Sequence, residues 1–190
     1  MKRKLKLQMQ ISVDGFVSTG TNDDQTWVTW ALEDIFQDVW DLSNSADTIL
    51  IGRKLAVDYI PFWQETFKNP NDPMFAFANQ IVNARKIVFT KTLEKSIWEN
   101  TEIAKGDLVD EVNNLKDQNG KDIVVYGGTS FVSSLVENNL IDEFYFYVNP
   151  VVLGKGETIF DKLKNPIKMT QVKSKEYNSG INLFIYKLKE

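Results

Sequence analysis

Three short segments of this chain combine residue types that can bind a phosphate group. Two adjacent glycines precede hydroxyl residues in Gly127-Gly128-Thr129-Ser130, a glycine precedes two basic residues in Gly52-Arg53-Lys54, and Thr90-Lys91 follows an apolar run. Glycines let a ligand approach the main chain, and the free amide groups at a helix start favour an anion. The pattern predicts a nucleotide phosphate near Gly127 and Gly128. The alternative there is a plain tight turn.

Each of these segments is expected to follow a strand. Residues 47–52, 84–90 and 122–126 are rich in β-branched and apolar residues. In open α/β sheets, ligands bind beyond the carboxyl ends of parallel strands, so the three segments should meet around one extended nucleotide. The alternative for Arg53 and Lys54 is a solvated basic start of a helix. Cations are disfavoured at that end of the helix dipole, however, so a basic pair there favours a bound anion.

The other elements follow from hydrophobic periodicity, beginning with a strand that alternates polar and apolar residues at 4–11. Helices are predicted at 29–43, from 53 onward, and at 75–82, 107–116 and 129–138; further strands at 101–104 and 142–149; an antiparallel hairpin at 167–177 and 181–188; and a structured excursion at 61–73. The pattern predicts one α/β domain over residues 1–190. Its sheet is mixed and mainly parallel, with about eight strands, a C-terminal antiparallel hairpin and helices on both faces.

The amino-acid composition limits the partners, metal sites and catalytic residues that this chain can have. With 43% hydrophobic and 25% charged residues the chain is expected to fold around a core, and a net charge of −4 argues against nucleic acid or an anionic membrane as partner. No apolar run is long enough for a membrane span or a signal peptide. The absence of Cys and His excludes disulfides, thiolate or imidazole metal sites and a Ser-His triad. We therefore expect a cytoplasmic protein without a metal, in which a carboxylate, Lys, Tyr or water moves protons.

Four ordered motifs give the chain a family resemblance. They are Ser12-Val13-Asp14-Gly15-Phe16-Val17, the segment 46–53, Val125-Tyr126-Gly127-Gly128 and the segment 150–160. Over nearly its whole length the chain resembles the dihydrofolate reductase-like fold. Within that fold it is most similar to the C-terminal reductase domain of bacterial bifunctional riboflavin-biosynthesis deaminase-reductases, and to free-standing proteins of the dihydrofolate reductase family. The resemblance implies a three-layer fold and NADPH as cofactor.

The resemblance also implies where the cofactor binds. Gly52, Arg53 and Lys54 would lie by its 2′-phosphate and pyrophosphate, Thr90 and Lys91 by its adenosine end, and Gly127, Gly128, Thr129, Ser130 and Phe131 by its pyrophosphate. Local positive charge favours NADPH over NADH, because the extra phosphate needs charge-assisted partners. The implied activity is hydride transfer to a C=N or C=O of a small heterocyclic or sugar-linked substrate, as in dihydrofolate reductase or 5-amino-6-(5-phosphoribosylamino)uracil reductase.

On the substrate side, Asp14 is a candidate acid or polar anchor, with an Asp-Gly turn as the structural alternative. Glu33 is the second candidate acid, and Asp34 competes with it. The substrate is expected to contact Asp14, Trp27, Val152 and Gly154. Trp27 and Trp30, with Phe36 nearby, can wall a flat pocket or belong to the core.

Two expectations concern the whole molecule. A homodimer is expected from the pairing of relatives. For the aromatic segment 144–147, an apolar surface for the partner and a place in the core are the two alternatives. The rival function is a non-catalytic nucleotide-binding module that keeps the cofactor cradle.

Overall fold

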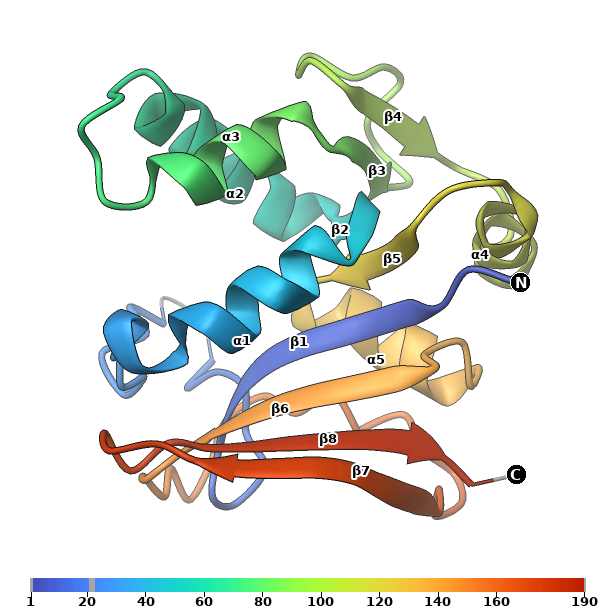
Figure 1. Ribbon diagram of the computed structural model, residues 1–190. Coiled ribbons are helices and arrows are strands. Elements are labelled where there is room, and N and C mark those ends of the chain that lie inside the picture. The colour runs from blue at the N-terminus through green and yellow to red at the C-terminus, as the bar shows by residue number, and fades with distance from the viewer. Residues whose placement is uncertain (1, 21–22, 190) are drawn as a thin grey trace.

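The computed structural model describes residues 2–20 and 23–189. Its centre is an eight-stranded sheet with helices on both faces (Figure 1). The strands are β1 (Leu5–Ser12), β2 (Ala46–Gly52), β3 (Arg85–Phe89), β4 (Thr101–Ala104), β5 (Asp122–Val125), β6 (Glu143–Asn149), β7 (Met169–Glu176) and β8 (Asn182–Leu188). The helices are α1 (Leu32–Asn44), α2 (Arg53–Phe67), α3 (Phe75–Asn83), α4 (Leu108–Asp117) and α5 (Thr129–Glu137). Across the described residues, no helix is both long and apolar enough to cross a membrane.

The sheet is mixed, as the sequence predicts. Its strand order is β4-β3-β2-β5-β1-β6-β8-β7. Pairing is parallel from β4 to β6, and β8 runs antiparallel to both β6 and β7. The predicted C-terminal hairpin is therefore confirmed, and its turn is closed by a hydrogen bond from the Tyr177 amide to the Ile181 carbonyl oxygen at 2.9 Å.

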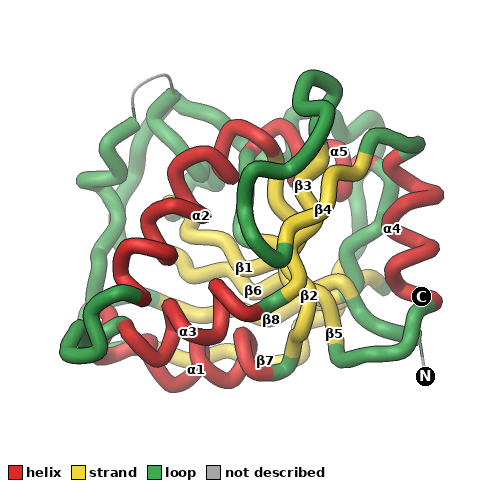
Figure 2. Tube along the Cα trace, turned by 90° about the horizontal axis from the view of Figure 1, so that it is seen from above, coloured by secondary structure: helices red, strands yellow, loops and turns green. Residues whose placement is uncertain are grey.

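The helices form two layers. Figures 1 and 2 show α1, α2 and α3 over one face of the sheet and α4 and α5 over the other. The first strand illustrates why: its apolar residues, such as Leu5 and Leu7, are fully buried in the core with α4 and α5. The alternate residues of β1 are polar and face the other layer, where the Lys6 ammonium donates to the Ser45 hydroxyl oxygen at 2.9 Å. The period-2 pattern thus sets the direction of each side chain.

The structure refines two expectations about segments of the chain. The segment 61–73 begins inside a helix, because α2 continues through Pro61 to Phe67. Proline removes a hydrogen bond to the residue four positions earlier, and that residue, Val57, is exposed, so water can bind the freed carbonyl. In the aromatic segment 144–147, Phe144, Phe146 and Tyr147 are buried within the chain. These three side chains build the core instead of offering apolar surface to a second copy.

Candidate functional site

The ends of β2 and β5 form a switch point in the sheet. The two strands are neighbours, yet α2 leaves β2 toward one face and α5 leaves β5 toward the other (Figure 2). The amide of Gly52 donates to the carbonyl oxygen of Gly127 at 3.4 Å, so the two strand ends touch. Open α/β sheets bind their ligands in the crevice at such a point. The arrangement therefore places Gly52-Arg53-Lys54 and Gly127-Gly128-Thr129-Ser130 side by side.

Glycine is required here for space. A β-carbon on Gly52 would lie 2.9 Å from the β-carbon of Phe131, and Gly128 has a φ of +45°, which side chains disfavour. Neither α2 nor α5 has a side-chain cap on its first amide groups. Both helices therefore begin with bare backbone N–H groups and the positive ends of their dipoles, which suit an anion.

The cations predicted to bind phosphate lie on adjacent strand ends. In the register of β2 and β3, Gly52 pairs with Phe89, the residue just before Thr90-Lys91. The ring of Phe89 stacks on that of Phe131 with centroids 4.8 Å apart, which joins the ends of β3 and β5. Within the described residues, the ion pairs include neither Arg53, Lys54 nor Lys91. These charges are therefore available to a ligand.

Thr90 and the start of α5 have internal contacts. The Thr90 hydroxyl oxygen accepts the amide hydrogens of Thr92 at 3.1 Å and Leu93 at 3.2 Å, so this side chain shapes the turn after β3. The carbonyl oxygen of Ser130 accepts the Lys162 ammonium at 3.3 Å. All ten residues predicted for the cofactor thus lie at or just beyond the ends of β3, β2 and β5. Their contacts with a cofactor stay predictions.

Asp14 joins two loops at the ends of β1 and β6. Its carboxylate accepts the Ser12 hydroxyl at 2.7 Å, the Leu153 amide at 3.1 Å and the Gly154 amide at 2.7 Å. The Ser12 hydroxyl, together with the two amides, lowers the pKa of Asp14. A carboxyl with a lowered pKa is ionised near neutral pH and is a poor proton donor. The geometry favours the role of polar anchor that was predicted beside the role of acid.

Asn149, at the end of β6, was missed by the sequence predictions. Its side chain is fully buried; its amide oxygen accepts the Thr29 amide at 2.7 Å, and its amide nitrogen donates to the Gln10 side-chain oxygen at 2.9 Å. It therefore fixes the segment before α1 to the sheet, and α1 begins at Leu32 instead of residue 29. The available signal was an amide residue that ends an aromatic strand just before a proline.

Apolar side chains are exposed at this edge of the sheet. The exposed fractions are 61% for Val13, 55% for Trp30 and 68% for Val152. Trp27 is half-buried and donates its indole N–H to the Asp23 carboxylate at 3.3 Å. The predicted contacts of Trp27 and Val152 with a substrate stay predictions. Phe36 instead packs in the core between α1 and α3, stacked on Trp40 at 6.0 Å.

The carboxylates of α1 differ in their contacts. Glu33 is exposed in the first turn of the helix. Asp34 accepts the Ser179 amide at 2.7 Å, and Asp38 accepts the Lys173 ammonium and the Tyr177 hydroxyl at 2.9 and 2.8 Å. Asp34 and Asp38 therefore attach α1 to the C-terminal hairpin. The acid role predicted for Glu33 stays a prediction.

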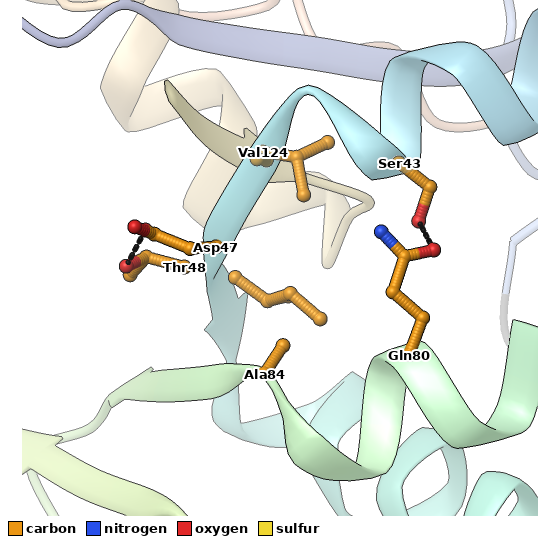
Figure 3. A pocket seen from close by; sticks show the side chains of 8 residues that line it. Ser43, Asp47, Thr48, Gln80, Ala84 and Val124 are labelled. Carbon is orange, nitrogen blue, oxygen red and sulfur yellow. Dashed lines mark hydrogen bonds between the residues drawn. The ribbon is translucent and has the colours of Figure 1, made fainter. Parts of the chain in front are cut away.

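Two cavities among the described residues lie at the opposite edge of the sheet. One, of about 10 Å³, is enclosed by the end of α1, the start of β2 and the end of α3. Figure 3 shows Ser43 and Gln80 facing each other beside it, and the Ser43 hydroxyl donates to the Gln80 side-chain oxygen at 2.7 Å. The other, of about 640 Å³, is an open groove between the end of α5, residues 163–168 and the end of β8. Neither contains a predicted cofactor or substrate residue, so the strand ends define the candidate site.

Known structures share this architecture. The chain aligns over 99% of its length, and over 57% of the other chain, with a diaminohydroxyphosphoribosylaminopyrimidine deaminase/5-amino-6-(5-phosphoribosylamino)uracil reductase from Thermotoga maritima, at a TM-score of 0.70 and 20% identity. It aligns over 100% of both chains with a dihydrofolate reductase from Enterococcus faecalis complexed with NADP(H), at a TM-score of 0.62 and 15% identity. These similarities confirm the predicted dihydrofolate reductase-like fold.

Sequence comparison agrees with the fold. The Bacillus subtilis protein YyaP is 32% identical over 189 residues, which cover 97% of this chain and 95% of YyaP. A family model described as the RibD C-terminal domain matches residues 3–183, nearly the whole chain. The predicted resemblance is therefore confirmed, and the chain belongs to the RibD C-terminal domain family.

Proposed function

We propose that this protein is a reductase that transfers a hydride from NADPH to a C=N or C=O bond of a small heterocyclic or sugar-linked substrate. Membership of the RibD C-terminal domain family, together with the structural similarity to a deaminase/5-amino-6-(5-phosphoribosylamino)uracil reductase, supports the reductase class. The single observation that carries the proposal is the contact between the ends of β2 and β5, where two helices without side-chain caps begin next to Arg53 and Lys54.

The residues present suit NADPH. The amide groups at the starts of α2 and α5 are donors for its pyrophosphate, and Gly52 and Gly128 add no β-carbon to that stretch of backbone. Arg53 and Lys54 offer charge-assisted donors to the 2′-phosphate, with Lys91 toward the adenosine end. When bound, NADPH supplies the hydride, and the protein contributes position and electrostatics.

On the substrate side, we assign Asp14 and Trp27 to positioning the substrate. Glu33 or a water molecule would donate the proton. Asp14 holds the backbone of Leu153 and Gly154, and so sets where Val152 and Gly154 meet the substrate. Trp27 would contact the substrate ring. Because Asp14 is ionised near neutral pH, it would polarise or bind the substrate and would not donate a proton.

The direct test is an NADPH titration followed by nicotinamide fluorescence. We expect NADPH to bind more tightly than NADH, and the double substitution Arg53→Ala/Lys54→Ala to weaken NADPH by about tenfold or more while changing NADH little. Lys164→Ala/Lys168→Ala is the matched control, because it removes the same charge from the groove at the other edge. Unchanged NADPH affinity in the first variant would show that the 2′-phosphate binds elsewhere.

A non-catalytic NADPH-binding module is the second candidate function. It is favoured by the hydrogen bonds that occupy the Asp14 carboxylate, since they leave this candidate acid without a proton to give. A screen for NADPH oxidation over pterins and ribitylaminopyrimidines separates the two. Tight NADPH binding without oxidation of any compound would favour the module.

A further inference from the structure

The two halves of the candidate site carry opposite charge. Arg53, Lys54 and Lys91 lie at the ends of β2 and β3. The loops around the ends of β1 and β6, residues 12–34 and 149–160, contain one basic residue, Lys155. The acidic residues of these loops are Asp14, Asp23, Asp24, Glu33, Asp34 and Glu157. Charges of one sign gathered at one edge attract ligands of the opposite sign and repel those of the same sign.

These loops form one structural unit. The Val13 amide donates to the Val151 carbonyl oxygen at 2.9 Å, and the Glu157 amide donates to the Ser18 carbonyl oxygen at 2.9 Å. Asn149 holds the segment before α1 through its hydrogen bond with the Thr29 amide. The acidic residues of the two loops are therefore held at the same edge of the sheet, next to the strand that precedes the paired glycines.

The acidic side chains of these loops are not paired with cations. In the part of the chain that the structure describes, the ion pairs include none of them. The Ser12 hydroxyl lowers the pKa of Asp14, and the amide and hydroxyl of Thr26 lower the pKa of Asp24. A substrate at this edge therefore meets ionised carboxylates beside the exposed apolar surfaces of Val13, Trp30 and Val152.

We propose that the substrate side selects a flat ring that is neutral or cationic and carries no phosphate group. The inference rests on the proposed reductase function and names its substrate class. A phosphate monoester carries nearly two negative charges near neutral pH and needs several charge-assisted donors, which these loops offer at Lys155 alone. The protein would therefore discriminate against the phosphoribosyl group that the name of the Thermotoga maritima relative contains.

A pair of ligands that differ by one phosphate tests this proposal. The probes are 5-amino-6-ribosylaminouracil and its 5′-phosphate, titrated against the NADP⁺-saturated protein by quenching of tryptophan fluorescence. We expect the riboside to bind about tenfold more tightly at low salt, with a smaller difference at high salt because ions screen the repulsion. Equal or tighter binding of the phosphate, or no binding of either ring, would overturn the proposal.

Charge variants show whether the acidic loops cause the difference. Asp24→Asn/Glu157→Lys should reduce the preference for the riboside by about threefold or more. Glu99→Gln/Glu137→Lys makes the same change of charge on exposed residues before β4 and at the end of α5, and should leave the preference unchanged. An equal effect of both variants would mean that net charge, not this edge, sets the preference.

NADPH affinity is measured by nicotinamide fluorescence on the same protein preparations without NADP⁺. Loss of NADPH binding in the unmodified protein would contradict the proposed function itself. Normal NADPH binding together with a preference for the phosphorylated ring would contradict only the inference about the substrate class.

Discussion

Gly52 has little room for a side chain where the ends of β2 and β5 meet. A methyl group there would meet the β-carbon of Phe131 at 2.9 Å, and neither backbone can shift without moving the start of α5. We expect Gly52→Ala to lower the free energy of unfolding by about 1–3 kcal/mol, as overpacking does, and to weaken NADPH. Urea unfolding measures the first effect and nicotinamide fluorescence the second.

Gly106→Ala is the control for this steric argument. Its methyl group would meet a Glu111 side-chain oxygen at 2.5 Å, which is the far end of a flexible side chain and can turn away. The expected change is below about 0.5 kcal/mol. Equal stability of the two variants would show that the ends of β2 and β5 can separate easily.

Two tyrosines on the face below α1 differ in one hydrogen bond. The Tyr147 hydroxyl is fully buried and has no protein partner among the described residues, whereas the Tyr177 hydroxyl donates to Asp38 at 2.8 Å. Removing an unsatisfied buried hydroxyl relieves a desolvation cost. We expect Tyr147→Phe to raise the free energy of unfolding by about 1 kcal/mol and Tyr177→Phe to lower it by about 1–2 kcal/mol. A loss of stability in Tyr147→Phe would reveal a bound water as the partner of this hydroxyl.

At the scale of the elements, α1 is attached to the C-terminal hairpin by Asp38. Burial opposes ionisation of this carboxyl, but hydrogen bonds from Lys175, Lys173 and Tyr177 outweigh burial and lower its pKa to about 2. A lowered folded-state pKa stabilises the protein above the unfolded-state pKa, and this stabilisation is lost as the pH falls toward the folded-state value. These hydrogen bonds of the ionised Asp38, called here the Asp38 clamp, therefore strengthen the contact between α1 and β7 at neutral pH.

We expect Asp38→Asn to lower the free energy of unfolding at pH 7 by about 1–2 kcal/mol, allowing for solvent screening at the two exposed lysines. Near pH 3 the difference between variant and parent should fall to about half. Urea unfolding at both pH values measures it. Asp41→Asn, an exposed residue of the same helix, should change stability by less than about 0.5 kcal/mol. A difference that does not depend on pH would exclude the ionised clamp.

At the scale of the whole molecule, local patterns predict the elements but not their order in the sheet. The alternation of Leu5, Leu7 and Met9 with polar residues predicts the first strand, and the glycines at the end of β2 and after β5 predict where those strands end. The insertion of β5 between β1 and β2 has no local signal, because it depends on which faces the connecting helices cover. The same limit applies within α2. Helix propensity predicts that Pro61 ends the helix, but the helix continues because Val57, whose carbonyl loses its hydrogen bond, is exposed to water.

The candidate site divides in a similar way. Residue type and spacing predict the phosphate-type segments, since Gly52-Arg53-Lys54 and Gly127-Gly128 each follow a recognisable strand. Contacts between distant loops cannot be read in this way. Two sets of hydrogen bonds join residues far apart in sequence: the amides of Leu153 and Gly154 donate to Asp14, and the amide of Thr29 donates to Asn149. These partners can be identified only once the order of the strands in the sheet is known.

The sheet order also predicts where the molecule opens. β1 and β5 are central strands with buried side chains, whereas β4 and β7 are edge strands and every residue of β7 is half-buried or exposed. Central amides should exchange their hydrogens only through global unfolding, and those of β4 and β7 through local openings that cost at least about 2 kcal/mol less. Hydrogen exchange followed by mass spectrometry measures both. Saturating NADPH should slow exchange most at the starts of α2 and α5, because the ligand covers those amides, while β7 keeps its rate relative to β1. Protection that appears in β7 but not at the two helix starts would place the nucleotide away from the ends of β2 and β5.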